Sequence, residues 1–290
     1  MVLTNSIVLT HLFRQITSQS VLYLYTEGHG DRKLASPPPP LPLDPSTLTL
    51  CCIDCREDKS DHTDLARRIA KSTQSVVLVP NYRLTPKEPT PENNIYHPSH
   101  ANDILLFLTR LLVWDGPPGT DIQEALKEIY LIGHSCSAHM IASIILDSTS
   151  ITPSLNTPAR LLDTIKGVVM SEGIFDPDQL VSCFPQYRER FVADAFGGAS
   201  KFSDFSVFNY PSRERMDSTR WLIVHSKNDT LIDVGQSQAM YEHISRLYLK
   251  QNLPVDKHVS LDTDGLQAEH DDIFKEDKYI EMISSFILRA

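Results

Sequence analysis

The chain has no apolar run close to the 18 or so residues that a membrane-spanning helix needs. Its first residues, MVLTNSIVLTHLFRQ, lack the basic start of a secretory signal peptide, and polar residues interrupt the short apolar pieces. Positive charge is also in deficit, with 27 basic against 37 acidic residues and a net charge of -10. These absences argue against a membrane protein, and against nucleic acid or an anionic membrane surface as the main partner.

The chain of 290 residues has few cysteines, and their number is odd. The five are Cys51, Cys52, Cys55, Cys136 and Cys183. An odd number in a long chain suits a reducing compartment better than a disulfide framework. The pair Cys52-x-x-Cys55 lacks two further ligands at zinc spacing, and its first cysteine lies in a predicted strand rather than at a helix N-terminus, where a redox pair needs it. We therefore expect a cytoplasmic protein with no metal and no cofactor.

Short β-branched runs alternate with amphipathic helical patterns along most of the chain. Strands are predicted over residues 46–54, 75–82, 128–134, 165–172, 218–226 and 256–262, and helices over 61–73, 99–112, 136–148, 236–251 and 271–290. This alternation is typical of an α/β fold, with a mostly parallel sheet covered by helices on both faces. We expect a single domain over residues 1–290.

Two segments fall outside the alternation. SPPPPLPLDPS (36–46) predicts an extended, proline-rich surface loop. FPQYRERFVADAFG (184–197) lies between two strands and predicts a helical insertion, which we place in a cap or lid over residues 175–215. The sequence leaves open whether residues 1–30 form strands.

The stretch LIGHSCSAHM (131–140) places Ser135 between an apolar strand and a helix. Gly133-His134-Ser135-Cys136-Ser137 has the form of a nucleophile elbow whose last glycine is replaced by serine. Small residues on both sides of the nucleophile let strand and helix approach closely around a strained backbone. The alternative is that Ser135 is an ordinary hydroxyl at the start of a buried helix.

Two partners for Ser135 follow later strands. Asp229 comes after strand 218–226 in KNDTLID, and His270 comes after strand 256–262 in AEHDDIF. The order Ser, Asp, His is the order found with nucleophile elbows, and the carboxyl ends of parallel strands meet at one edge of the sheet. We predict that His270 takes the proton of Ser135 and that Asp229 holds the imidazole tautomer. Singly, Asp229 is also a candidate turn carboxylate and His270 a candidate surface histidine.

The order of elements, with GHSCSA, VHSKNDTLID and AEHDDIF, resembles the α/β-hydrolases. Within that superfamily, VPNYRLTPKEPTPENNIYHPSHANDI (79–104) and SEGIFDPDQLVSCFPQYRERF (171–191) are similar to the fungal kynurenine formamidases (arylformamidases) and the hormone-sensitive-lipase-like esterases. The resemblance covers residues 47–290. It implies the α/β-hydrolase fold, an acyl-enzyme mechanism without a cofactor, and cleavage of N-formyl-L-kynurenine to kynurenine and formate in tryptophan catabolism.

The chain departs from this group after strand 46–54. There the group has His-Gly-Gly, whose N–H groups complete the oxyanion hole, and this chain reads Asp-Cys-Arg-Glu-Asp over 54–58. The N–H of Cys136 remains as one donor, and those of Cys55 and Arg56 are candidates for the second. A missing donor costs about 10²–10³ in rate. A small-molecule carboxylesterase and a non-catalytic binding protein of the same fold therefore remain alternatives.

Aromatic residues near the insertion are candidates for the substrate pocket, because they can wall a flat ring. These are Phe175, Phe184 and Tyr187, which at helical spacing also fit an ordinary core. Glu172 and Asp176 are interpreted as turn or cap groups. The expected partner is a small-molecule substrate, and the oligomeric state is open, a homodimer included.

Overall fold

The structure is a computed structural model that describes residues 23–25, 47–52, 60–86, 88, 90, 92–115, 122–198, 201–213 and 216–289. The proline-rich segment 36–46 lies outside these ranges, so the surface loop predicted there stays a prediction. Of residues 1–30, the structure describes one short strand.

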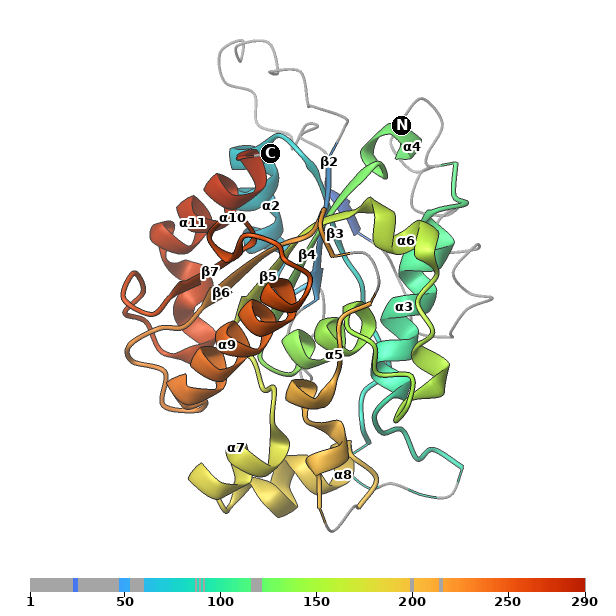
Figure 1. Ribbon diagram of the computed structural model, residues 1–290, viewed down its shortest axis with the longest axis vertical. Helices are drawn as coiled ribbons and strands as arrows, with labels where there is room; N and C mark the ends of the chain where they lie inside the picture. The colour runs from blue at the N-terminus through green and yellow to red at the C-terminus, as the bar shows by residue number, and fades with distance from the viewer. Residues whose placement is uncertain are drawn as a thin grey trace, which may run out of the picture.

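A central sheet of seven strands runs through the described part of the chain (Figure 1). Its strands, in chain order, are β1 (Tyr23–Tyr25), β2 (Thr47–Cys52), β3 (Val76–Val79), β4 (Glu128–His134), β5 (Ile165–Ser171), β6 (Arg220–Val224) and β7 (Val259–Asp262). Their order across the sheet is β1-β3-β2-β4-β5-β6-β7. Only β1 is antiparallel to its neighbour, so the prediction of a mostly parallel sheet is confirmed.

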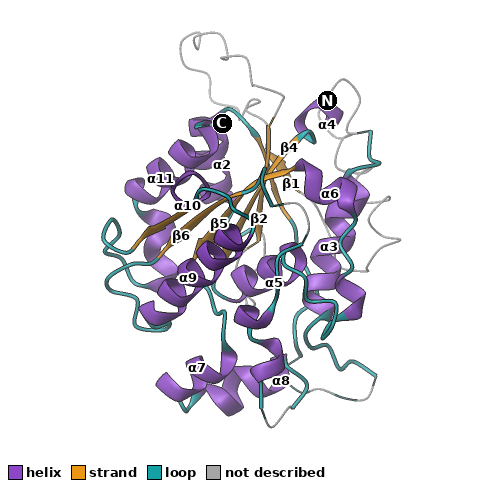
Figure 2. Ribbon diagram, viewed as in Figure 1, coloured by secondary structure: helices purple, strands orange, loops and turns teal. Residues whose placement is uncertain are grey.

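Helices surround this sheet (Figure 2). The α-helices are α2 (Thr63–Thr73), α3 (Ser99–Leu111), α4 (Ile122–Ala125), α5 (Cys136–Ile145), α6 (Ala159–Thr164), α7 (Pro177–Cys183), α8 (Ala193–Ala195), α9 (Val234–Lys250), α10 (Val255–His258) and α11 (Asp277–Leu288). Shorter turns are η1 (Pro153–Leu155), η2 (Arg188–Val192, a π-helix), η3 (Ser203–Phe205), η4 (Val207–Asn209) and η5 (His270–Lys275).

Alternation of side chains along the strands divides the core into two layers. On β4, Ile129 and Leu131 pack with α3, α5 and α9, whereas Tyr130 and Ile132 pack with α2 and α11 on the opposite face. A strand that is apolar at every position has to be buried on both sides, because successive side chains point to opposite faces. The prediction of helices on both faces is confirmed.

The prediction of one continuous helix from residue 271 is wrong. Residues His270–Lys275 form η5, and α11 begins at Asp277. The break lies at Glu276, whose backbone is extended with ψ of 130°. Its Oε1 accepts hydrogen bonds from the N–H groups of Gln267 (2.9 Å) and Ala268 (2.7 Å). Because the Glu276 side chain binds the loop that precedes His270, α11 begins at the next residue, Asp277.

The predicted strand 256–262 is also shorter than expected. Its first residues belong to α10, which follows Pro254, and β7 begins only at Val259. The His258 ring is hydrogen-bonded to the carbonyl oxygens of Pro254 (2.8 Å) and Asp217 (3.0 Å), which stabilises this helical turn.

The segment that the sequence assigns to a cap lies beyond the carboxyl ends of the strands, where α7 and α8 are seen in Figure 1. As predicted, Asp176 caps a helix: its Oδ1 accepts the N–H of Gln179 in the first turn of α7. Its residues Leu180, Val192 and Phe202 form an apolar cluster with Ile232 of the loop after β6. It contacts the main body through the rings of His97 and His139, both within 5.4 Å of the Phe196 ring centre.

Within the described ranges, no helix is both long and apolar enough to cross a membrane.

Gly133 sets the distance between β4 and α5. A Cβ atom at this position would lie 2.9 Å from both the Cα and the N of Ala138, which are backbone atoms of α5. Contacts this short cannot be relieved by turning a side chain, so α5 would have to move away from the sheet. Gly133 therefore allows the first turn of α5 to lie close to β4, as the sharp turn between them requires.

We predict that Gly133→Ala lowers the free energy of unfolding by about 1–3 kcal/mol, the usual cost of overpacking a core. Urea unfolding followed by circular dichroism measures this change. A midpoint equal to that of the unmodified protein would show that α5 can shift without cost, and would contradict the close approach.

Candidate active site

Ser135 stands at a sharp turn between β4 and α5. Its φ of 54° and ψ of -123° lie in a region that residues other than glycine rarely adopt. Strain of this kind costs about 1–3 kcal/mol and persists only where neighbouring structure enforces it. Here the Ser135 N–H donates to the Ser171 carbonyl (3.0 Å), and its own carbonyl accepts from Ala138 and Ile174 (both 3.2 Å). The strand, sharp turn and helix predicted around this serine are present.

Serine is accommodated at the last elbow position. Ser137 is fully buried, and its Oγ lies 3.3 Å from the hydroxyl of Tyr82, which also lies 3.8 Å from the Cys136 sulfur. The extra hydroxyl therefore has a polar neighbour, and it leaves the turn intact.

One expected donor of the oxyanion hole lies among the described residues. Cys136 is the first residue of α5, and the N–H groups of a first helical turn point out of the helix toward any anion at its end. Cys55 and Arg56 lie outside the described residues. Their part in the oxyanion hole stays a prediction.

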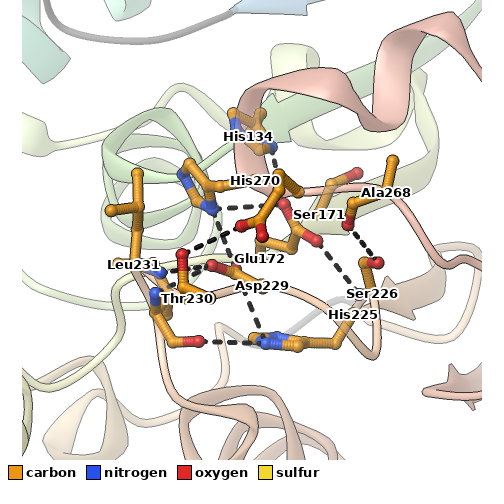
Figure 3. Close-up of polar contacts among 12 residues, drawn as sticks. His134, Ser171, Glu172, His225, Ser226, Asp229, Thr230, Leu231, Ala268 and His270 are labelled. Atoms are coloured by element: carbon orange, nitrogen blue, oxygen red, sulfur yellow. Dashed lines mark hydrogen bonds and ion pairs between the residues drawn. The ribbon is translucent and has the colours of Figure 1, made fainter.

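Asp229 and His270 form a buried pair (Figure 3). The Nδ1–H of His270 donates to Asp229 Oδ2 over 2.8 Å, and the two side chains are 4% and 0% exposed. The other oxygen of Asp229 accepts from the N–H groups of Leu231 (2.8 Å) and Ile232 (2.9 Å). The backbone thus holds the carboxylate in place, and a proton on Nδ1 leaves Nε2 of the ring as the base.

Ser135 is related to this pair through the residue before it. The ring of His134, the residue before Ser135, packs against the His270 ring with 4.3 Å between centres. Although both residues are described, no hydrogen bond joins Ser135 to His270. Such bonds are often long before a substrate binds. The structure therefore brings Asp229 and His270 into direct contact and places Ser135 one residue from a ring that touches His270.

Glu172 is a site residue that its interpretation as a turn or cap group misses. It directly follows β5, has a positive φ of 50° and is fully buried. Its Oε1 accepts the Ser226 N–H (3.0 Å), and its Oε2 lies 3.2 Å from His270 Nδ1 (Figure 3). One sequence signal was present: the residue after β5 has to lie beside the residue after β4, because these strands are parallel neighbours with His134 opposite Ser171.

A second histidine, His225, supports the Asp229 side of the site. Its Nε2 lies 3.2 Å from the Ile232 carbonyl and 3.5 Å from Asp229 Oδ2, and its Nδ1 is bonded to Ser237 (2.9 Å). Burial lowers the pKa of His225, so this ring is neutral at neutral pH. It packs beneath the loop that carries Asp229.

The charges at His270 depend on one another. Burial alone lowers the pKa of His270, but contacts with Asp229 and Glu172 outweigh burial and raise it above its ordinary value. Burial, with the charge of Asp229, raises the pKa of Glu172 against the opposing effect of its contact with His270. When Glu172 binds a proton, its share of the rise at His270 is lost. The imidazole and Glu172 therefore titrate as one unit.

Three side chains of this site are also close enough to one another to bind a metal ion. Ligand atoms of His134, Glu172 and His270, all buried, lie within 4.8 Å of one another. However, Nδ1 of His270 already donates to Asp229, and an ion there would displace that proton. The absence of a metal stays a prediction.

The three candidate pocket residues separate into two groups. Phe175 is fully buried in the main core, where its N–H donates to the Gln236 side chain (2.8 Å). Phe184 and Tyr187 lie in the cap segment with their rings stacked at 5.1 Å and an interplanar angle of 18°. Their contact with a substrate stays a prediction.

Comparison with known proteins gives no match to a protein-family model and no relative by sequence among curated proteins. Solved structures do resemble the chain. A thermophilic esterase from the Planctomycetes species Thermogutta terrifontis, bound to propionate, has 13% identity and a TM-score of 0.59, over 93% of this chain and 89% of that one. Inhibited esterase B from Lactobacillus rhamnosis has 16% identity and a TM-score of 0.60, over 85% and 76%.

Esterase LipW from Mycobacterium marinum is similar in the same way, with 14% identity and a TM-score of 0.55, over 84% of this chain and 71% of that one. The parallel sheet, the covering helices and these likenesses together define the architecture. The chain has the α/β-hydrolase fold.

As the pH is lowered, this protein should begin to lose stability at pH values above those at which ordinary carboxylates titrate. Burial lowers the pKa of six histidines below 6.5: His97, His100, His134, His139, His225 and His243. For a base whose folded pKa is depressed, stability is complete above the unfolded pKa and falls as pH drops toward the folded one. Three of these values are about 4, so the loss runs from about pH 6.5 to 4.

We therefore expect the free energy of unfolding to fall between pH 7 and 5, by up to about 1.4 kcal/mol per pH unit for each histidine that only the unfolded chain protonates. Urea unfolding at pH 7, 6 and 5 measures the slope. His139→Gln should make the slope shallower by one histidine's share. Equal stability at pH 7 and pH 5 would contradict the prediction.

Proposed function

We propose that this protein is a serine hydrolase that cleaves a small carboxylic ester through an acyl-enzyme on Ser135. The observation that carries the proposal is the strained turn at Ser135, one residue after the His134 ring that packs on His270, together with the buried Asp229–His270 pair. Resemblance to structures of esterases supports the same reaction class. Fold alone does not decide function, so the site carries the argument.

In the proposed reaction, Ser135 Oγ attacks the carbonyl carbon of the ester while Nε2 of His270 takes its proton. The negative charge that develops on the carbonyl oxygen is stabilised by the N–H of Cys136 and by a second N–H, for which Cys55 and Arg56 are candidates. When the C–O bond breaks, the alcohol leaves with the proton from His270. In the second half of the reaction, His270 takes a proton from a water molecule, which attacks the acyl carbon. The bond between the acyl group and Ser135 Oγ breaks, the acid leaves, and Ser135 regains its proton from His270.

A formamide is the second candidate substrate. The segment 171–191 is similar in sequence to the kynurenine formamidases, and it contains the stacked rings of Phe184 and Tyr187. In this case the bond broken is the C–N bond of N-formyl-L-kynurenine, and the products are formate and kynurenine. The ester has the stronger support because the structural neighbours are esterases.

A third candidate is a binding protein that retains the fold without catalysis. The observation behind it is the replacement of His-Gly-Gly by Asp-Cys-Arg-Glu-Asp at 54–58. In the two enzyme cases the partner is a small-molecule substrate, and in the third it is a ligand or another partner. A cytoplasmic location stays a prediction.

Labelling of Ser135 separates the two enzyme candidates from the binding protein. A fluorophosphonate should form a Ser135–phosphorus bond with loss of fluoride, and peptide mapping by mass spectrometry should place the adduct on this serine. Ser135→Ala is the control and should not label. If the folded, unmodified protein carries no adduct after prolonged exposure, both enzyme candidates are wrong.

Two assays then separate ester from formamide. We expect hydrolysis of p-nitrophenyl acetate with a higher kcat/KM than formate release from N-formyl-L-kynurenine, and a loss of about 10⁴-fold in Ser135→Ala. The opposite ranking of the two substrates would make the formamidase the better description of this protein.

A further inference from the structure

Glu172 reaches His270 from a strand end that the triad does not use. Its N–H donates to the Val224 carbonyl (2.9 Å), so the chain still follows the sheet at this residue. Its Oε1 accepts the Ser226 N–H from the loop after β6. These two bonds join β5 to β6 and fix the direction of the side chain.

The second oxygen of Glu172 requires a separate explanation. Oε2 is buried, it has no hydrogen-bond partner that satisfies both distance and angle among the described residues, and it faces two imidazoles. It lies 3.2 Å from Nδ1 of His270 and 3.9 Å from Nδ1 of His134. A buried carboxylate oxygen without a compensating positive group is costly. A glutamate that served only to accept the Ser226 N–H would need one oxygen, and glutamine would serve equally well.

We propose that Glu172 is a second carboxylate for His270, which shares the Nδ1–H with Asp229 and stabilises the imidazolium that forms when Ser135 loses its proton. This inference deepens the proposed function and rests on it. Asp229 is the nearer acceptor, at 2.8 Å against 3.2 Å. Glu172 is thus a positioning residue that acts through His270.

The groups around the imidazole come from several elements. Glu172 follows β5, Asp229 and His225 lie in and next to the loop after β6, and His134 ends β4. Further titratable neighbours among the described residues are Tyr279 of α11, which bonds to Ser171, and His62, which interacts with His134. Glu269 and Asp271 flank His270 in the chain, and Glu269 Oε2 accepts from the Thr230 hydroxyl. The ring of Phe274 closes the site above His134, with 4.7 Å between the ring centres. Among these groups, the carboxylates of Glu172 and Asp229 stabilise a positive charge on His270.

If both Glu172 and Asp229 act on His270, replacement of Asp229 should lower kcat less than it does in an ordinary serine triad. In a serine triad, replacing the aspartate by asparagine lowers kcat by about 10⁴, because the imidazole takes the wrong tautomer. Here Glu172 would still accept the Nδ1–H, so Asp229→Asn should lose only about 10–10² in kcat. Glu172→Gln with Asp229→Asn should lose about 10⁴. The double loss would then exceed the product of the single losses.

Glu172→Gln alone tests the charge. Glutamine keeps the size of the side chain and the oxygen that accepts the Ser226 N–H, so this structural bond is retained. A carboxylate within 4–6 Å raises the pKa of a cation by about 1–3 units. We expect kcat to fall about 3–30-fold, and the acid limb of kcat/KM to move to lower pH by about one unit. Lower pH is the expected direction because removing a negative charge makes His270 easier to deprotonate.

Tyr279→Phe is the matched control. It removes the buried hydrogen bond to Ser171, the residue before Glu172, and leaves the charges at His270 unchanged. It should lower the melting temperature about as much as Glu172→Gln does, without moving the pH profile. A shift of the acid limb in Tyr279→Phe equal to that in Glu172→Gln would overturn the proposal, because general loosening of the site would then explain both.

Nuclear magnetic resonance gives a readout that needs no catalysis. The Nδ1–H proton and the ring nitrogens of His270, assigned with His270→Asn, report the pKa of the imidazole directly. We expect this pKa to fall in Glu172→Gln and to fall further when Asp229→Asn is added. If the unmodified protein fails to label at Ser135 while the resonance shifts as described, the proposed function is wrong and the two-carboxylate site stands. An imidazole pKa unchanged by Glu172→Gln overturns the site itself.

Discussion

Three backbone hydrogen bonds continue the parallel sheet just past the ends of its strands, and the arrangement of the site depends on them. They join neighbouring strands in turn: Ser135 N–H to Ser171, Glu172 N–H to Val224, and His225 N–H to Asp262. Because the chain keeps sheet geometry for one residue beyond each strand, three consecutive strands present their next side chains at the same level. Ser135, Glu172 and His225 are therefore neighbours through backbone register.

Burial then determines what these side chains do to one another. Glu172 and Asp229 have no exposed side-chain surface, and His270 has little. In such an environment a charge is weakly screened, so a contact of 3 Å changes proton affinity far more than it would at the surface. The same burial keeps six other histidines neutral. Six imidazoles thus form part of the packed interior, whereas the His270 ring is held against two carboxylates that favour its protonated form.

Much of the fold was readable from the sequence, because it depends on local patterns. Alternating apolar strands and amphipathic helices predict the covered parallel sheet, and the positions of Asp229 and His270 after successive strands predict their contact. The part of Ser135 stays a prediction. What was missed depends on contacts between distant segments. Glu172 touches His270 only because two strands run in register, and the helix break at Glu276 arises from a carboxylate that turns back to bind a loop. The break at Glu276 has no signature in the neighbouring residues, whereas Glu172 is signalled only by its place after the strand that pairs with β4.

The strained backbone of Ser135 has a consequence for how this protein can be studied. A positive φ at serine is kept only while β4, β5 and α5 all hold it, through hydrogen bonds to Ser171, Ala138 and Ile174. Any partly folded state that loses one of these supports lets the serine relax to an ordinary conformation. The reactivity proposed for Ser135 would then vanish before secondary structure does. A covalent probe of this one residue would therefore count the fully native molecules in a population.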